Sequence, residues 1–254
     1  MSDNTIISID LAKNVFQVAI LQGRTITSNK QYKRAALIKF IANTAPATIA
    51  MEACYSSHYW ARECEKYGHR VLIVPAQHVK PFTRGNKTDA NDAIAIIEAS
   101  QRPNLRFVSV KSTHQQDIQS LHRIRERLVR NRTSLVNQTR GLLAEYGIVS
   151  KVGKKGFLLG IEDALNNEAL SDILKHELSS TLNELHSITE HIKSIESHLR
   201  RYVENDPRCQ LIYSIPGIGV INASALVCKF GNASQFSKAR SLSCLLYTSD
   251  AADE

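Results

Sequence analysis

The sequence lacks the features that define several common protein classes. No apolar run among its 254 residues approaches the 18 that a membrane-spanning helix needs, and its first four residues lack the basic and apolar regions of a signal peptide. Its five cysteines are an odd number without a C-x-x-C pair, so neither a zinc ribbon nor a disulfide framework is predicted. We expect a protein of the reducing cytoplasm with no membrane partner.

Glycine is scarce where nucleotide-binding enzymes need it. Residues 1–100 contain only Gly23, Gly68 and Gly85, and these are far apart in the sequence. Actin-like kinases and ATPases, whose first strand also ends in an acidic residue, hold phosphates in glycine-rich loops. The sequence therefore argues against that class.

Acidic residues are nearly missing from one basic segment. The chain has 32 Lys and Arg against 24 Asp and Glu, a net charge of +8. Residues 102–140 contain nine of the basic residues, opposed only by Asp117 and Glu126, so this segment alone carries +7 (nine minus two). A solvated helix face usually mixes both signs, and this imbalance instead indicates a polyanionic partner. Arg123, Arg127 and Arg130 share one face of the helix predicted there and are candidate nucleic-acid contacts.

The first hundred residues predict a mixed α/β domain. Alternating and apolar runs predict strands at 5–10, 15–21, 24–29, 47–52 and 70–74. Apolar residues at helical spacing predict helices at 33–42, 56–67 and 89–100. Three strands of a meander followed by alternating helices and strands describe the ribonuclease-H-like (RuvC-like) architecture.

Four acidic residues are candidate metal ligands. Asp10 and Glu52 end the first and fourth predicted strands, and Asp89 and Asp92 lie one turn apart at the start of a helix. Alone, the last pair has a simpler interpretation, because Thr88 or Asp89 could cap the helix and its dipole favours acids in the first turn. Four converging carboxylates, however, would repel one another without a cation. Hard divalent ions take carboxylate oxygens, so we expect Mg²⁺ or Mn²⁺ there.

Two long helices are predicted after residue 120, packed as a coiled-coil hairpin. In the first, one predicted seam runs through Leu121, Ile124, Leu128, Asn131, Leu135, Gln138 and Leu142. In the second, the two seam positions are occupied by Leu178, Leu185, Ile192 and Leu199, and by Thr181, Ile188, Ile195 and Tyr202. Residues 151–160 are interpreted as a basic, glycine-rich connector.

Residues 211–223 predict a helix-hairpin-helix. The turn contains Gly217 and Gly219, which would let the backbone approach a phosphate at the start of the next helix. Such contacts position DNA without reading its sequence. The alternative is a plain tight turn between two helices.

Three motifs together resemble the Asp-Glu-Asp-Asp (DEDD) insertion-sequence transposases, the IS-one-ten family, which includes the Piv-type DNA invertases. The resemblance lies in Ser8–Lys13, Met51–Cys54 and the long run His78–Ala93, and covers about residues 5–245. It implies that Asp10, Glu52, Asp89 and Asp92 are catalytic and hold the metal ion. Lys13, Arg84 and Lys87 in the same motifs are expected nucleic-acid contacts.

The resemblance also implies partners and a reaction. Members act on the DNA of element ends and targets, use a structured guide RNA, and assemble as dimers or tetramers. Cleavage and rejoining of strands in the family use a serine nucleophile in the C-terminal domain. A protein that only binds nucleic acid, without catalysis, is the alternative function.

We expect a catalytic domain at 1–104, a basic helical region at 105–205 and a partial C-terminal transposase domain at 206–245. Residues 246–254 depart from the family pattern and look like translated sequencing-adapter read-through, so a non-native tail is expected there. Ser249 does not have the context of the family's serine, and no nucleophilic serine is assigned in this chain. A truncated copy, inactive in strand transfer, is therefore expected.

Overall fold

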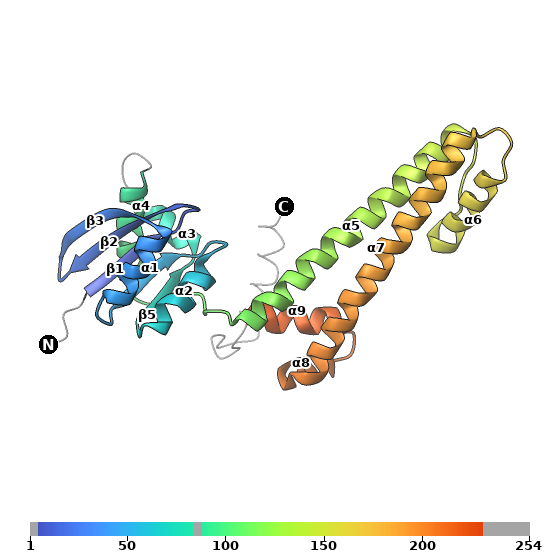
Figure 1. The fold of residues 1–254 in the computed structure, drawn as a ribbon. Helices are drawn as coiled ribbons and strands as arrows, with labels where there is room; N and C mark the ends of the chain where they lie inside the picture. Colours follow the sequence, from blue (N-terminus) through green and yellow to red (C-terminus); the bar gives the residue numbers. More distant parts are fainter. Residues whose placement is uncertain (1–4, 84–87, 231–254) are drawn as a thin grey trace. The chain divides into compact units, whose positions relative to one another are not determined.

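The structure is a computed structural model that describes residues 5–83 and 88–230 (Figure 1). The chain divides into two compact units, the first ending at Ser112 and the second beginning at Thr113. The first unit is built on a sheet, and the second is helical throughout its described part.

A five-stranded sheet forms the centre of the first unit. Its strands are β1 (Thr5–Asp10), β2 (Val15–Gln22), β3 (Thr25–Lys33), β4 (Thr48–Glu52) and β5 (Arg70–Val74), in the order β3-β2-β1-β4-β5. β1, β2 and β3 form an antiparallel meander, while β4 and β5 run parallel to β1. The eight strands and helices predicted in residues 1–100 occur in the predicted order, and two short helical elements that were not predicted lie between β5 and the last helix, at Ala76–Val79 and Lys80–Phe82.

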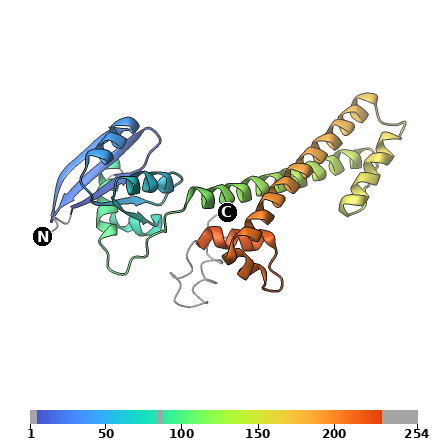
Figure 2. The ribbon, with the colours of Figure 1, turned by 60° about the horizontal axis from the view of Figure 1, so that its bottom comes forward.

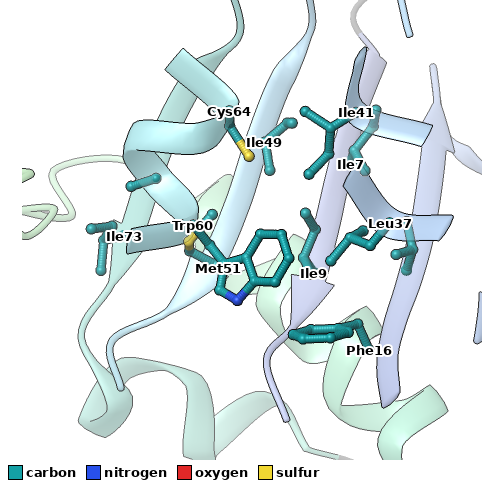
Figure 3. Packing of buried hydrophobic residues seen from close by; sticks show 12 residues of the cluster. Ile7, Ile9, Phe16, Leu37, Ile41, Ile49, Met51, Trp60, Cys64 and Ile73 are labelled. Atoms are coloured by element: carbon teal, nitrogen blue, oxygen red, sulfur yellow. The ribbon is translucent and has the colours of Figure 1, made fainter. Parts of the chain in front are cut away.

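Helices cover both faces of this sheet. α1 (Arg34–Asn43) and α2 (Ser57–Lys66) pack on one face, where Ile7, Ile9 and Trp60 are among the fully buried side chains of one core (Figure 3). α3 (Ala76–Val79), the 3-10 helix η1 (Lys80–Phe82) and α4 (Asp89–Ser100) belong to a second core with Ile6. Because side chains alternate along a strand, the even-numbered residues of β1 face α4.

The first unit extends past residue 104, where the sequence placed a domain boundary. The amide of Val108 donates to the carbonyl of Ile73 at 2.8 Å, and Arg62 Nη1 donates to the carbonyl of Lys111 at 2.6 Å. The amide of Lys111 donates to His58 Nδ1 at 3.2 Å. Burial, together with the charges of Lys111 and Arg62, lowers the pKa of His58 to about 4, so the ring is neutral at pH 7, and the hydrogen bond from Lys111 favours the tautomer in which Nδ1 is the acceptor.

The second unit is a helical hairpin with smaller helices at each end. α5 (Thr113–Glu145) and α7 (Asp172–Asn205) pack side by side along their length (Figures 1 and 2). α8 (Pro207–Tyr213) and α9 (Val220–Phe230) pack where α5 begins and α7 ends. None of the helices in residues 5–83 and 88–230 is long and apolar enough to cross a membrane.

Two sequence predictions for this unit need correction. Residues 151–160 are not a plain connector, because α6 (Gly153–Leu165) begins within them and buries Phe157 and Ile161. In α5, the seam position that contains Leu128 and Leu135 faces the core, although Leu142 at its end is 42% exposed. At the other predicted position, Ile124, Asn131 and Gln138 are all exposed. This second seam position is therefore wrong.

The second seam position of α5 is shifted by one residue toward the C-terminus, from that of Ile124 to that of Arg125. Ile118 and Thr139 are buried at this position, and Arg125 joins them by an ion pair from its Nη2 to Glu196 Oε1 of α7 at 2.7 Å. The sequence favoured Ile124 over Arg125 because isoleucine is the more apolar residue. The acidic partner on α7, which comes from another part of the chain, makes the arginine acceptable at the interface.

We predict that Leu128→Ala lowers the free energy of unfolding by about 2–4 kcal/mol, because it empties a buried volume between α5 and α7. Ile124→Ala, one turn away on the same helix, removes a partly exposed side chain and should cost less than about 1 kcal/mol. Urea denaturation of both variants measures the difference. Equal losses would mean that Ile124 lies in the interface as the heptad pattern suggested.

Candidate functional site

Two of the four acidic residues lie side by side at the carboxyl edge of the sheet. β1 and β4 are parallel neighbours with Ile9 opposite Met51, and Asp10 and Glu52 are the next residue on each strand. Ile9 and Met51 belong to the core under α1 and α2. Alternation therefore turns Asp10 and Glu52 to the other face, the one that α4 covers.

The other two acidic residues are in the first turn of α4. Thr88 caps this helix, because its hydroxyl oxygen accepts from the amide of Asn91 at 3.3 Å. Asp89 and Asp92 are thus not needed as the cap, although the helix dipole still favours them in the first turn. Asp92 is half-buried and Asp89 is exposed.

Hydrogen bonds of three polar residues, which the sequence analysis missed, hold α4 against the sheet beside the acids. Ser8 Oγ, fully buried on β1, donates to the carbonyl of Ala93 at 2.6 Å. Asn29 Nδ2 on β3 donates to the carbonyl of Ala90 at 3.0 Å, and its Oδ1 accepts from Gln17 Nε2 at 2.5 Å. The available signal was a polar residue at a core-facing position of an apolar strand, as with Ser8 and Gln17.

The four acidic residues interact electrostatically. Burial, and after it the negative charges of Asp92, Asp89 and Glu52, together raise the pKa of Asp10 from its ordinary 3.8 to about 6. A hydrogen bond from the amide of Leu11 acts against this rise. The folded chain therefore brings negative charge together in a half-buried place where it is unfavourable.

The side chains do not converge into a finished metal site. Within the described ranges, no three His, Cys, Asp or Glu side chains are placed to hold one ion. The pKa of Asp10 nevertheless responds to all three other carboxylates, so the backbone brings them to one region. The donor set itself, four carboxylates, suits a hard divalent ion.

Comparison with known proteins identifies the family of the chain. Residues 7–148 match the family model of the DEDD transposases of IS110, and residues 209–248 match that of the transposase IS116/IS110/IS902 family. The chain belongs to the IS110 family of transposases.

Several curated relatives of this transposase cover nearly its whole length. It is 40% identical over 244 residues to a probable family 20 transposase of Pseudomonas aeruginosa, spanning 94% of this chain and 72% of the relative. It is 36% identical over 249 residues to the transposase for insertion sequence element IS1111A of Coxiella burnetii, spanning 97% and 68%. It is 35% identical over 246 residues to the transposase for IS1328 of Yersinia enterocolitica, spanning 94% and 72%.

A solved structure of RuvC from Thermus thermophilus is also similar, at 11% identity and a TM-score of 0.26, over 42% of this chain and 85% of that one.

The expected nucleic-acid contacts of the transposase occupy different settings. Lys13 is exposed in the loop between β1 and β2, whereas Arg84 and Lys87 lie outside the described residues. Arg123 and Arg127 are exposed one turn apart on α5. Arg130 is exposed too, but its guanidinium pairs with Glu126 one turn before it.

The turn between α8 and α9 contains both predicted glycines. Gly217 has a φ of +89°, which favours glycine, and Gly219 immediately precedes α9. A Cβ atom added at Gly219 would meet nothing within 4 Å. Within the described part of the chain, a larger residue at position 219 would therefore not clash with neighbouring atoms.

The raised pKa of Asp10 predicts a pH-dependent gain from Asp10→Asn in metal-free buffer. As the pH rises from 4 to 6, the native protein loses stability, because Asp10 releases its proton at a lower pH in the unfolded chain than in the folded one. A full rise from 3.8 to about 6 is worth about 3 kcal/mol, and we expect about 1–2 kcal/mol at pH 7.5 because the carboxyl is partly exposed to solvent. The gain should shrink toward zero near pH 4. Urea denaturation across this range measures it, with Asp163→Asn on an exposed part of α6 as the control.

Proposed function

We propose that this transposase binds the DNA of its insertion element and cleaves and rejoins DNA strands with a divalent metal ion held by Asp10, Glu52, Asp89 and Asp92. The observation that carries the proposal is the register of β1 and β4, which sets Asp10 beside Glu52 on the face that α4 covers, with Asp89 and Asp92 in the first turn of α4. The raised pKa of Asp10 supports it. Buried negative charge of this kind is costly unless a ligand compensates it, and it marks functional sites in general. The strand order also supports the ribonuclease-H-like architecture in which such acids are expected.

Mg²⁺ or Mn²⁺, when bound, would polarise a scissile phosphate and stabilise its developing negative charge. The chain's own residues hold the carboxylates in place. Asp10 and Glu52 stand on adjacent parallel strands, whose spacing is set by backbone hydrogen bonds. Ser8 and Asn29 fix the first two turns of α4, and with them Asp89 and Asp92. No residue of this chain is assigned as the nucleophile.

Nucleic acid would lie against the basic face of α5 and the turn before α9. Arg123 and Arg127 offer exposed cations for backbone phosphates. The amides at the start of α9 and the open space beside Gly219 suit a phosphate, as in a helix-hairpin-helix. A guide RNA, which the family resemblance implies, would supply sequence specificity by base pairing. Contacts to phosphate alone would then be enough for the protein.

Association between copies of the chain is part of the proposal. Large apolar side chains are exposed near the end of the hairpin that carries α6, namely Val149, Val152 and Ile173. Exposed apolar residues in one region favour a protein–protein contact. A dimer or tetramer would cover them.

We predict that Mg²⁺ or Mn²⁺ raises the melting temperature of the native protein by mass action, because the ion binds the folded carboxylates and not the unfolded chain. Asp10→Asn and Asp92→Asn should each abolish most of this rise, since each removes a ligand. Differential scanning fluorimetry with increasing metal ion measures the effect.

Asp163→Asn is the matched control, because it removes one exposed carboxylate elsewhere and should leave the response to metal unchanged. If the native protein and Asp92→Asn respond identically, the four acids do not share a metal ion. DNA binding without any metal response would favour the alternative, a non-catalytic nucleic-acid-binding protein.

Replacing Arg123, Arg127 and Arg130 together with glutamine should flatten the slope of log K against log salt by about 2–3 units for duplex DNA, since each phosphate contact contributes about 0.9. Most of the change should come from Arg123 and Arg127, because Arg130 already pairs with Glu126. Fluorescence anisotropy at several salt concentrations measures the slope. The control, Arg24→Gln with Lys39→Gln, removes two exposed charges of the first unit. If the control flattens the salt slope as much as the α5 variant does, the arginines of α5 do not form a DNA-binding surface.

A further inference from the structure

A polar cleft lies directly beside the four acids. Its volume is about 780 Å³, and β2, β3 and the first turn of α4 line it. Six of its lining residues are polar: Gln17, Asn29, Lys30, Gln31, Thr88 and Asp89. Asp89 belongs both to the cleft and to the four acids, so the two places are continuous.

We propose that this cleft is a binding site for the DNA strand on one side of the phosphate that is cut, and that Gln31 contacts that strand. The inference rests on the proposed function, because it assumes that the four acids act on DNA. Beyond that function, it states the path of the DNA strand, which leads from the four acids across β2 to β3.

The register of the sheet builds a polar row in this direction. Asp10 on β1 stands opposite Gln17 on β2, which stands opposite Gln31 on β3. Cross-strand partners point to the same face, so all three side chains share the face of Asp10. Two strand spacings separate Asp10 from Gln31, about 10 Å, which is the rise of about three nucleotides along one strand of B-DNA.

Two residues of the cleft support its shape instead of contacting a ligand. Gln17 is only 6% exposed and donates to Asn29, which in turn donates to the carbonyl of Ala90 at the start of α4. This chain of hydrogen bonds joins β2, β3 and α4 across the cleft. Asn29 and Gln17 are therefore positioning residues.

Gln31 remains on the solvent side. It is exposed on β3, which is an edge strand of the sheet. Lys30 stands opposite Val18 and so turns to the other face. The side-chain amide of Gln31 can donate to phosphate or sugar oxygens without placing a further charge beside the four carboxylates.

Site-specific photocrosslinking tests the position of the strand. The photoreactive residue p-benzoylphenylalanine replaces Gln31 in the full chain, and labelled mixed-sequence DNA is added as a duplex and as one of its single strands, with Mg²⁺. We expect a protein–DNA adduct from position 31. Matched controls replace Gln22, exposed at the far end of β2, and Lys39, exposed on α1 over the other face of the sheet.

DNA affinity is an independent test, because it uses alanine variants in place of the bulky photoreactive residue. Gln31→Ala should weaken DNA binding about 2- to 10-fold without changing its salt slope, because it removes an uncharged hydrogen bond. Gln22→Ala should change neither quantity. Gln31 and Gln22 are both exposed, so the two variants are expected to fold, and a melting curve checks this.

The outcomes separate this inference from the function on which it rests. If DNA binds and metal stabilises the protein, but position 31 crosslinks no more than positions 22 and 39, the cleft does not hold the strand and the proposed function stands. If a labelled RNA crosslinks at position 31 and DNA does not, the inference is wrong about the ligand. If neither DNA binding nor a metal response is found, both proposals fall.

Discussion

The gathering of four carboxylates at one edge of the sheet is the constraint on which the site of the first unit depends. Parallel pairing of β1 with β4 brings Asp10 beside Glu52, and the start of α4 adds Asp89 and Asp92 on the same face. Burial first, and then the charges of the other three acids, raise the pKa of Asp10 to about 6. An arrangement that costs free energy persists only where the surrounding fold holds it, and here hydrogen bonds from Ser8 and Asn29 to the backbone of α4 do so.

The same hydrogen bonds link the acids to the cleft beside them. Asn29 both anchors α4 and lines the cleft, and Gln17 lies opposite Asp10 while supporting Asn29. A change at either residue would therefore disturb the acids and the cleft together. Polar residues at core-facing positions of a strand are costly unless they are paired, and these two are paired with each other.

Arginines in and near α5 divide into two groups. Arg125 forms an ion pair with Glu196 across the helical hairpin, and Arg140 donates to Ser150 and to two backbone carbonyls before and within α6. These side chains hold helices together. Arg123 and Arg127 are exposed and available to a polyanion. The excess of basic residues in the sequence thus combines a structural part with a surface part, and the composition alone does not separate them.

The sequence by itself determined the order of strands and helices in the first unit, the four acids at strand and helix ends, and the family. These features follow from local periodicity and from short motifs, both of which depend on residues that are close together in the sequence. Only the tertiary structure decided which residues face one another across elements. Ser8, Gln17 and Asn29 gained their roles from partners that lie between 12 and 85 positions away in the chain. Arg125 displaced Ile124 from the hairpin interface because Glu196, 71 positions later, compensates its charge. Hydrogen bonds and ion pairs between distant residues leave no periodic trace in the sequence, so only the folded chain shows them.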